Sequence, residues 1–129
     1  SDVYKRQDEF PAFYTPFSGI QAPNRMDKPE EVAHCMKTQW DLGLVGGLLI
    51  ANPLPEENAL DQKLLRNVVE EALEEARKKQ VLGKDITPFV LERIFEKTGG
   101  KSLDANIKLV QNNARLGARI ASAFTKLKS

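Results

Sequence analysis

The stretch that most constrains the fold is residues 44–51, which read LVGGLLIA. Apolar side chains stand at both even and odd positions, so a strand formed here presents apolar groups on both faces. Strands of this kind occur in parallel sheets that helices cover on both sides. The Asn-Pro-Leu-Pro sequence at 52–55 ends the strand, because proline lacks the N–H group that a β-ladder needs. The sequence therefore predicts an α/β fold with at least one fully buried strand.

Four stretches have the apolar spacing of helices, and together they predict helices packed on this sheet. The first begins near Pro29, since proline suits a first turn, and ends at Gly43. Residues 61–80 form the clearest helix, with one apolar face opposite a glutamate-rich one. A short helix is expected from Thr87 as its cap, and the last helix from Ser102 as its cap. Residues 10–15, which are aromatic and flanked by prolines, are expected to form an edge or entry strand.

The last helix carries two adjoining stripes and is expected to be deeply packed, because together they are too wide for an exposed helix. One stripe places Asn106 and Asn113 in line with apolar residues, and a carboxamide on a buried stripe costs free energy unless a partner satisfies it. The partner is either the protein itself or a ligand. The apolar members of this stripe are Leu109, Leu116 and Ile120, and the second stripe consists of Ile107, Val110, Ala114, Gly117, Ala121 and Phe124.

The first seven residues, SDVYKRQ, do not resemble the rest of the chain. The string DVYKRQ is the translation of GAT GTG TAT AAG AGA CAG, a transposon end used in preparing sequencing libraries. We interpret residues 1–7 as an adapter-derived, non-native tail, which is set aside before the fold is considered and is expected to pack on nothing. The alternative is an ordinary polar N-terminus.

The charge balance argues against a nucleic-acid or membrane-surface protein. The formal net charge is +1, and it falls to zero when the tail is removed, because the tail holds two basic residues and one acidic residue. No apolar run approaches the roughly 20 residues of a membrane-spanning helix. The single cysteine, Cys35, excludes an internal disulfide framework and suits a reducing compartment. We therefore expect neither a nucleic-acid nor a membrane partner.

No convincing set of catalytic or metal-binding residues emerges from residue types and spacing. His34 and Cys35 are adjacent on a predicted helix, so their side chains point in different directions, and no second histidine or cysteine completes a metal site. The glutamates between Glu70 and Glu75 are read as a solvated helix face. The glycines of GGLLIANP come before the apolar strand, whereas a phosphate-binding loop follows one. The sequence thus assigns no catalytic residue and no metal ligand.

Four blocks together resemble the C-terminal part of the pseudouridine-5′-phosphate glycosidases. They are PAFYT at 11–15, GGLLIANPLPEE at 46–57, TPF at 87–89 and GGKSLDANIKLVQNNA at 99–114. They occur in the family's order and at similar spacing. The resemblance implies that residues 8–129 are the C-terminal part of a single glycosidase domain, so the fold is expected to be incomplete.

The resemblance implies an activity for the parent protein: reversible cleavage of the C–C glycosidic bond of pseudouridine 5′-phosphate to uracil and ribose 5-phosphate. It also implies a Mn²⁺ cofactor, a homotrimer, and a cytoplasmic location, or an organellar one in a eukaryotic source. The family's acid/base Glu, imine-forming Lys and metal-binding Asp belong to the part outside this segment, so the segment alone is expected to be inactive.

Asn106 is the one site residue that the resemblance assigns. Ser102, Asn106 and Ile107 match the family's S-x-x-x-N-I block, in which the Asn binds the pyrimidine. A carboxamide has one acceptor oxygen and two donor hydrogens, so it can form two hydrogen bonds with the imide edge of uracil. Asn112 and Asn113 are instead expected to tie the helix to a neighbouring loop.

Two other function classes remain open from the sequence. One is a different α/β enzyme of sugar or nucleotide metabolism. The other is a non-catalytic helical interaction module, which the missing chemistry favours and the predicted buried strand at 44–51 disfavours.

Overall fold

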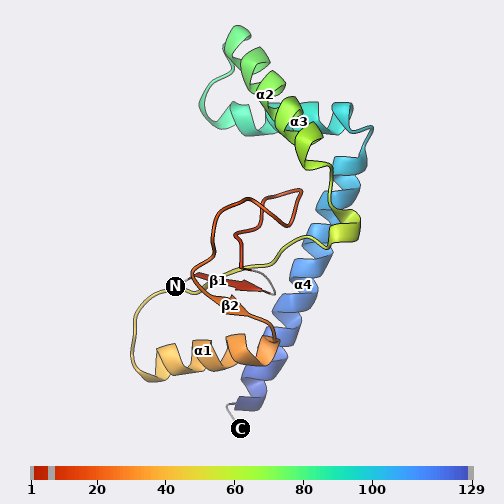
Figure 1. Cartoon of the computed structure of the whole chain (residues 1–129). Coiled ribbons are helices and arrows are strands. Elements are labelled where there is room, and N and C mark those ends of the chain that lie inside the picture. Colours follow the sequence, from red (N-terminus) through yellow and green to blue (C-terminus); the bar gives the residue numbers. More distant parts are fainter. Residues whose placement is uncertain (1, 6–7, 128–129) are drawn as a thin grey trace.

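The computed structural model describes residues 2–5 and 8–127, the first four through their backbone alone. Figure 1 shows an elongated molecule with α4 along one side, the α2–α3 pair at one end and α1 at the other. The elements are β1 (Asp2–Lys5), β2 (Arg25–Met26), α1 (Pro29–Asp41), β3 (Leu49–Ala51), η1 (Glu56–Asn58), α2 (Gln62–Lys78), η2 (Gly83–Asp85), α3 (Ile86–Lys97) and α4 (Lys101–Leu127). The expectation of helices packed on a small sheet is confirmed.

The sheet is parallel and has the strand order β2-β1-β3. The expected strand at 44–51 is shortened to Leu49–Ala51, with Ile50 packed against residues of α1 and α4. Its expected burial on both faces is wrong: Leu49 is exposed, and so are Leu44 and Val45 before it. The physical reasons are a glycine at position 46 with a φ of 143°, which interrupts the extended path, and apolar cover from one side only.

The N-terminal tail is not free of contacts, which corrects the expectation that it packs on nothing. β1 pairs with β2 through Tyr4 and Lys5, and with β3 through Asp2 to Tyr4. Backbone groups alone suffice for this pairing, so its sequence need not have evolved for it. Residues 1, 6 and 7 lie outside the described part of the chain, and the adapter origin of the tail stays a prediction.

The edge strand expected at 10–15 is also wrong, because this segment belongs to an irregular loop. The loop closes on itself through an antiparallel bridge between Glu9 and Gln21 and a hydrogen bond from the Phe10 N–H to the Ile20 carbonyl, 2.7 Å long. Prolines at 11 and 16 remove the donors that a longer ladder would use.

Helix α1 begins and ends where the sequence predicts. Pro29 occupies its first turn, and the Glu31 carboxylate accepts hydrogen bonds from the backbone N–H groups of Asp27 and Lys28 at 2.8 and 2.9 Å. Gly43 follows the helix with a φ of 70°, and its N–H donates to the Trp40 carbonyl. This left-handed glycine stops the helix at low cost.

Helices α2 and α3 lie against each other at one end of the molecule (Figure 1). The Asp61 side chain caps α2 by accepting from the Leu64 N–H at 2.6 Å. Thr87 is not the cap of α3, because the turn η2 leads directly into that helix. Glu75 of α2 is not simply solvated as expected: Arg93 of α3 donates two hydrogen bonds to its carboxylate, 2.9 and 3.0 Å long.

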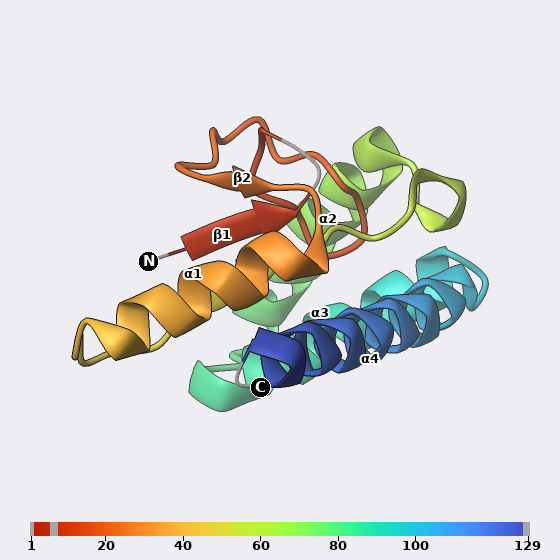
Figure 2. The same ribbon diagram turned by 90° about the horizontal axis from the view of Figure 1, so that it is seen from below.

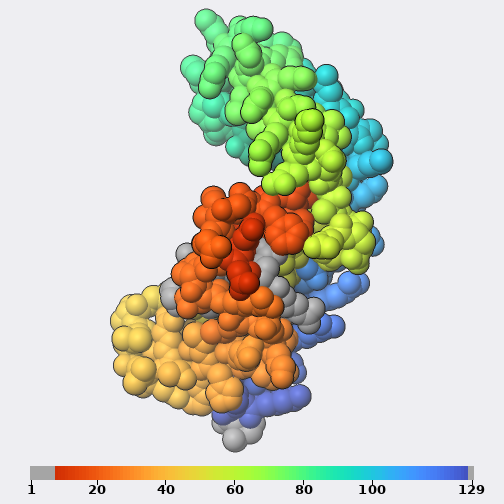
Figure 3. All heavy atoms as spheres, in the orientation of Figure 1, coloured from red at the N-terminus to blue at the C-terminus, as the bar shows by residue number. Residues whose placement is uncertain are grey.

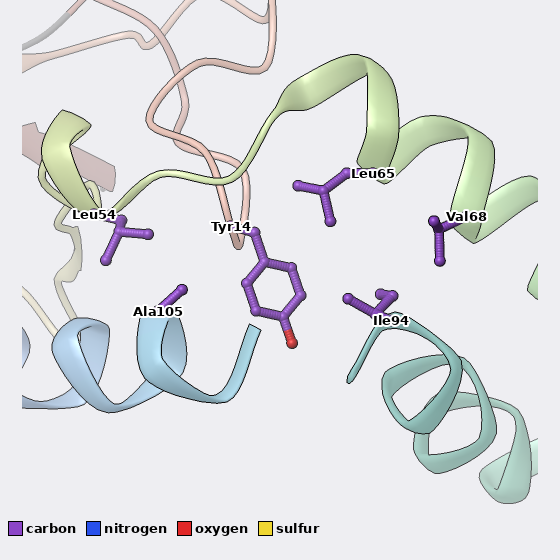
Figure 4. Packing of buried hydrophobic residues seen from close by; sticks show 6 residues of the cluster. All are labelled: Tyr14, Leu54, Leu65, Val68, Ile94 and Ala105. Atoms are coloured by element: carbon purple, nitrogen blue, oxygen red, sulfur yellow. The ribbon is translucent and has the colours of Figure 1, made fainter. Parts of the chain in front are cut away.

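The core consists of two apolar clusters. The first cluster joins the loop, α2, α3 and α4, and Figure 4 shows the Tyr14 ring between its other members. They are Leu54, Leu65, Val68, Ile94 and Ala105. The second cluster joins Val32 of α1 to Leu116 and Ile120 of α4, with Ile50 of β3 packed against it. Among the helices of the described part, α4 alone contributes to both clusters.

Helix α4 is only partly buried, which corrects the expectation of deep packing. Figure 2 shows α4 beside α1 below the sheet, and Trp40 of α1 meets Phe124 of α4 edge to face at 5.4 Å. The stripe of Leu109, Leu116 and Ile120 faces these partners. The second stripe, from Ile107 to Ala121, faces outward. No helix among the described residues is long and apolar enough to cross a membrane.

Deleting residues 1–7 is expected to lower the melting temperature, because β1 lies between β2 and β3 and joins them. The comparison is a thermal melt of residues 1–129 against residues 8–129, followed by circular dichroism. An unchanged melting temperature would show that the β1 pairing adds nothing measurable in solution.

The Glu75–Arg93 pair is expected to make stability depend on acid pH. Hydrogen bonds from Arg93 hold the pKa of the Glu75 carboxyl at about 2, below its ordinary 4.5. Stability from a lowered carboxyl pKa is present above the unfolded value and is lost as pH falls through the window from 4.5 toward 2. Glu75→Gln should flatten the fall in melting temperature across that window. Glu74→Gln, at an exposed neighbour, should leave it as steep as in the parent chain.

Candidate functional site

The turn between α3 and α4 sets the direction in which α4 begins. Gly99 and Gly100 have φ values of 60° and 84°, a left-handed conformation that glycine adopts without strain. Thr98 takes over the capping role that the sequence assigned to Ser102. Its hydroxyl oxygen accepts from the Ser102 N–H at 3.2 Å and donates to the Ile94 carbonyl at 2.7 Å. Ser102 itself lies buried in the first turn of α4.

Tyr14 connects the loop to this turn. Its ring is buried in the first cluster, and its backbone carbonyl accepts from the Leu60 N–H at 3.0 Å. Burial raises the pKa of the Tyr14 phenol, and a hydrogen bond with the Ser102 side chain acts in the opposite direction. Phe13 meets Tyr14 edge to face at 4.6 Å and is half exposed. The loop thus turns the Tyr14 ring inward and leaves the preceding Phe13 ring open to solvent.

A hollow of about 150 Å³ lies where the loop, α3 and the start of α4 meet. Cavities on the order of 150 Å³ hold a six-membered aromatic ring in other proteins. The walls are mostly aromatic and aliphatic, and Asn106 and two hydroxyl-bearing residues supply the polar groups. The lining residues are Phe13, Tyr14, Leu91, Phe95, Ser102, Leu103 and Asn106.

The three asparagines of α4 differ in their hydrogen bonding. The Asn112 side chain donates to the Pro53 carbonyl at 3.2 Å, and Asn113 accepts from the Asn52 side chain at 3.0 Å. Both tie α4 to the loop after β3, as the sequence predicted. Within the described residues, no hydrogen bond engages the half-buried Asn106 carboxamide. Its donors and acceptor therefore remain available to a molecule in the hollow.

A second, larger hollow of about 420 Å³ lies beside the loop that follows β3. The carboxyl ends of parallel strands are where open α/β sheets bind ligands. Arg115 and Arg119 of α4, Glu56 of η1, and the side chains of Asn52 and Asn112 supply its polar wall. Its polar wall combines two arginines with one glutamate, whereas the hollow beside Asn106 places a carboxamide that has no hydrogen bond in the described residues next to aromatic rings.

Conventional catalytic or metal groups do not gather at either hollow. No group of three or more His, Cys, Asp or Glu side chains could hold a metal ion among the described residues. His34 is exposed and Cys35 is half-buried, both on α1. Sequence reasoning missed the aromatic wall of the Asn106 hollow. Phe13 and Tyr14 belong to the PAFYT block, so that block was the sequence signal that pointed to them. The contact of these residues with the start of α4 could not be predicted from the sequence.

Comparison with known proteins identifies the family. Residues 3–123 match the profile of the indigoidine synthase A like proteins. The chain belongs to this family. Its fold also matches that of a longer member: it superposes on a crystal structure of an indigoidine synthase A-like protein from Thermotoga maritima with a TM-score of 0.78 at 34% identity. That superposition covers 99% of this chain and 41% of the other.

Curated proteins that are similar in sequence to this chain carry a more specific name. A pseudouridine-5′-phosphate glycosidase of Caldanaerobacter subterraneus is 54% identical over 95% of this chain and 40% of its own length. One from Lysinibacillus sphaericus is 52% identical over 93% of this chain and 40% of its own length. The chain therefore spans about two fifths of the length of these relatives.

A more distant solved structure shares the fold. The prealnumycin C-glycosynthase, crystallised with ribulose 5-phosphate, superposes with a TM-score of 0.88 at 23% identity. It covers 98% of this chain and 42% of the other. The family segment thus has the same architecture inside chains more than twice as long.

The hydrogen bond between Tyr14 and Ser102 is expected to stabilise the site. Tyr14→Phe keeps the buried ring and removes the hydroxyl, so it should cost about 1 kcal/mol of unfolding free energy. Ser102→Ala removes the same bond from the other side. Urea unfolding of both single variants and the double variant checks this: the double variant should lose less than the two single losses added. Additive losses would mean that the two hydroxyls do not interact.

Proposed function

We propose that this chain is the C-terminal part of a pseudouridine-5′-phosphate glycosidase, an enzyme that reversibly cleaves the C–C glycosidic bond of pseudouridine 5′-phosphate to uracil and ribose 5-phosphate. The observation that carries the proposal is the Asn106 hollow. It combines the size for one six-membered ring, an aromatic and aliphatic wall, and a carboxamide without a protein partner in the described residues. The relatives with this name, 46–54% identical, support it independently.

In this proposal Asn106 binds the uracil edge. One carboxamide oxygen accepts from the imide N–H and one amide hydrogen donates to an adjoining carbonyl, which gives two hydrogen bonds in a setting partly removed from water. The exposed Phe13 and Phe95 rings at the same hollow offer apolar faces to the base. Uracil, a flat ring with a polar edge, suits such a combination of walls.

The cleavage chemistry itself is proposed to come from the part of the longer relatives that this chain does not span. The described residues offer no donor set for Mn²⁺, so its ligand is proposed to lie in that part as well. The same holds for the acid/base Glu and the imine-forming Lys. An imine suits this reaction because a C–C bond has no leaving oxygen that an acid could protonate. The imine on the opened sugar instead serves as an electron sink when the bond breaks.

The assembly and location are also proposals: a homotrimer of the complete protein, in the cytoplasm.

The sugar-phosphate half of the substrate agrees with the ribulose 5-phosphate bound in the related C-glycosynthase. A purely helical interaction module is disfavoured, because the chain contains a parallel sheet and belongs to this family.

Asn106→Ala is expected to weaken uracil and pseudouridine 5′-phosphate binding by one to two orders of magnitude, the equivalent of about 1–3 kcal/mol for hydrogen bonds lost to a buried polar ligand. Asn106→Asp should be worse, because it replaces a donor with an acceptor and adds an unpaired charge. The enzyme to test is a chimera in which residues 8–127 replace the matching segment of the Caldanaerobacter glycosidase. Steady-state kinetics in both directions give the readout.

Asn113→Ala is the matched control, since it removes the same side chain two turns along α4. It breaks the contact to Asn52 and should lower the melting temperature while leaving the KM for uracil unchanged. Capture of ribose 5-phosphate should change little in either variant. If Asn106→Ala weakened both substrates equally, or only unfolded the chimera, Asn106 would be a structural residue and the proposal would fail.

A further inference from the structure

The outer face of α4 is an apolar surface that the described residues leave uncovered. We define this face by Leu103, Ile107, Val110, Ala114, Gly117 and Ala121, which recur at helical spacing along one side of α4. Leu103, Ile107 and Val110 are 50%, 45% and 61% exposed, although each is a large apolar side chain. A helix face that meets solvent normally carries charged or polar residues. All six positions here are apolar or glycine.

Gly117 adds a second, independent observation. A glycine inside a helix costs up to about 1 kcal/mol relative to alanine, so contacts within this chain would have to justify that cost if they were its cause. Apart from its two chain neighbours and the backbone of α4 itself, no atom of residues 8–127 lies within 4 Å of the position where a Cβ atom at Gly117 would stand. The space is therefore open, and no neighbour in the described part explains the missing side chain. Close approach of a further segment to α4 would explain it.

The family comparison identifies the occupant. The same fold occurs inside chains of which this segment is 41–42%, and it keeps its architecture there with TM-scores of 0.78 and 0.88. The curated relatives are longer in the same proportion. The part of each such protein outside this segment can bury apolar surface on it, and the outer face of α4 offers a run of such surface along the helix. In Figure 3, α4 lies in blue along one edge of the molecule.

We infer that the outer face of α4 is the docking surface for the part of the longer family members that this chain does not span, with Gly117 at the point of closest approach. Leu103 belongs both to this face and to the wall of the Asn106 hollow. Docking there also covers the hollow and brings the reacting groups beside Asn106, a consequence that rests on the proposed function. The docking itself rests on the family and the exposed face alone.

Gly117→Leu separates this inference from a solvent-exposed face. In the isolated chain the leucine enters open space and improves helix propensity, so the melting temperature should stay equal or rise by a few degrees. In the chimera with the Caldanaerobacter glycosidase, the same leucine should clash with the docked segment and lower the melting temperature. The expected result is a change in melting temperature of opposite sign in the two proteins. If the isolated chain shows no thermal transition, the melting temperature of the chimera alone tests the inference.

A second pair of variants tests the same face in case the chimera accommodates a leucine at position 117. Ile107→Asp and Val110→Asp place a charge on the outer face, whereas Lys108→Asp places the same side chain between them on another face of α4. The outer-face variants should lower the melting temperature of the chimera by much more than Lys108→Asp does. These readouts concern stability, so they stand even if Asn106 does not bind uracil.

Two outcomes would overturn the inference. If the outer-face variants cost the chimera no more than Lys108→Asp, and Gly117→Leu does not destabilise it, the face is exposed in the complete protein. If sedimentation shows that these variants convert an oligomeric chimera to a folded monomer with an unchanged unfolding midpoint, a second copy is the occupant instead.

Discussion

The structure depends on α4, which supplies residues to both apolar clusters. Ala105 and Leu109 pack with Tyr14 and the α2–α3 pair, and Leu116 and Ile120 pack with Val32 of α1. Because both clusters pack along one helix, the distance between them follows from the rise of the helix. Without α4, the α2–α3 pair and the α1–sheet unit would share few contacts. The start of α4 is therefore also where the candidate site is fixed.

The site arises where three independent local structures meet. The Gly99–Gly100 turn sets the direction of α4, Thr98 satisfies the first turn, and the loop places Tyr14 against Ser102. Each feature alone is an ordinary stabilising device. Together they leave Asn106 at the rim of an aromatic hollow with a carboxamide that has no hydrogen bond in the described part of the chain. A polar group kept free beside apolar walls is typical of ligand recognition.

The surface of the segment likewise combines charged side chains that have partners with apolar side chains that the described residues do not cover. Charged contacts such as Glu75 with Arg93 hold α2 and α3 together. By contrast, the outer face of α4 and the apolar residues before β3 meet solvent. Because this fold is about two fifths of longer chains, we infer that the rest of such a chain covers the outer face of α4. Large contiguous apolar patches on a protein surface commonly mark interaction sites.

The sequence by itself determined the helices, their main boundaries and the family. Apolar periodicity and the signals at Pro29, Gly43 and Asp61 each act on residues only a few positions away, so local physics suffices to predict where the helices begin and end. It also singled out Asn106, through a resemblance and not through geometry. Tertiary structure decided the rest: the loop in place of a strand at 10–15, the shortened β3, the central position of β1, and the exposure of the second α4 stripe. These depend on which segments are present to pair or to cover a face, and burial is a property of neighbours distant in the chain, which no local pattern encodes.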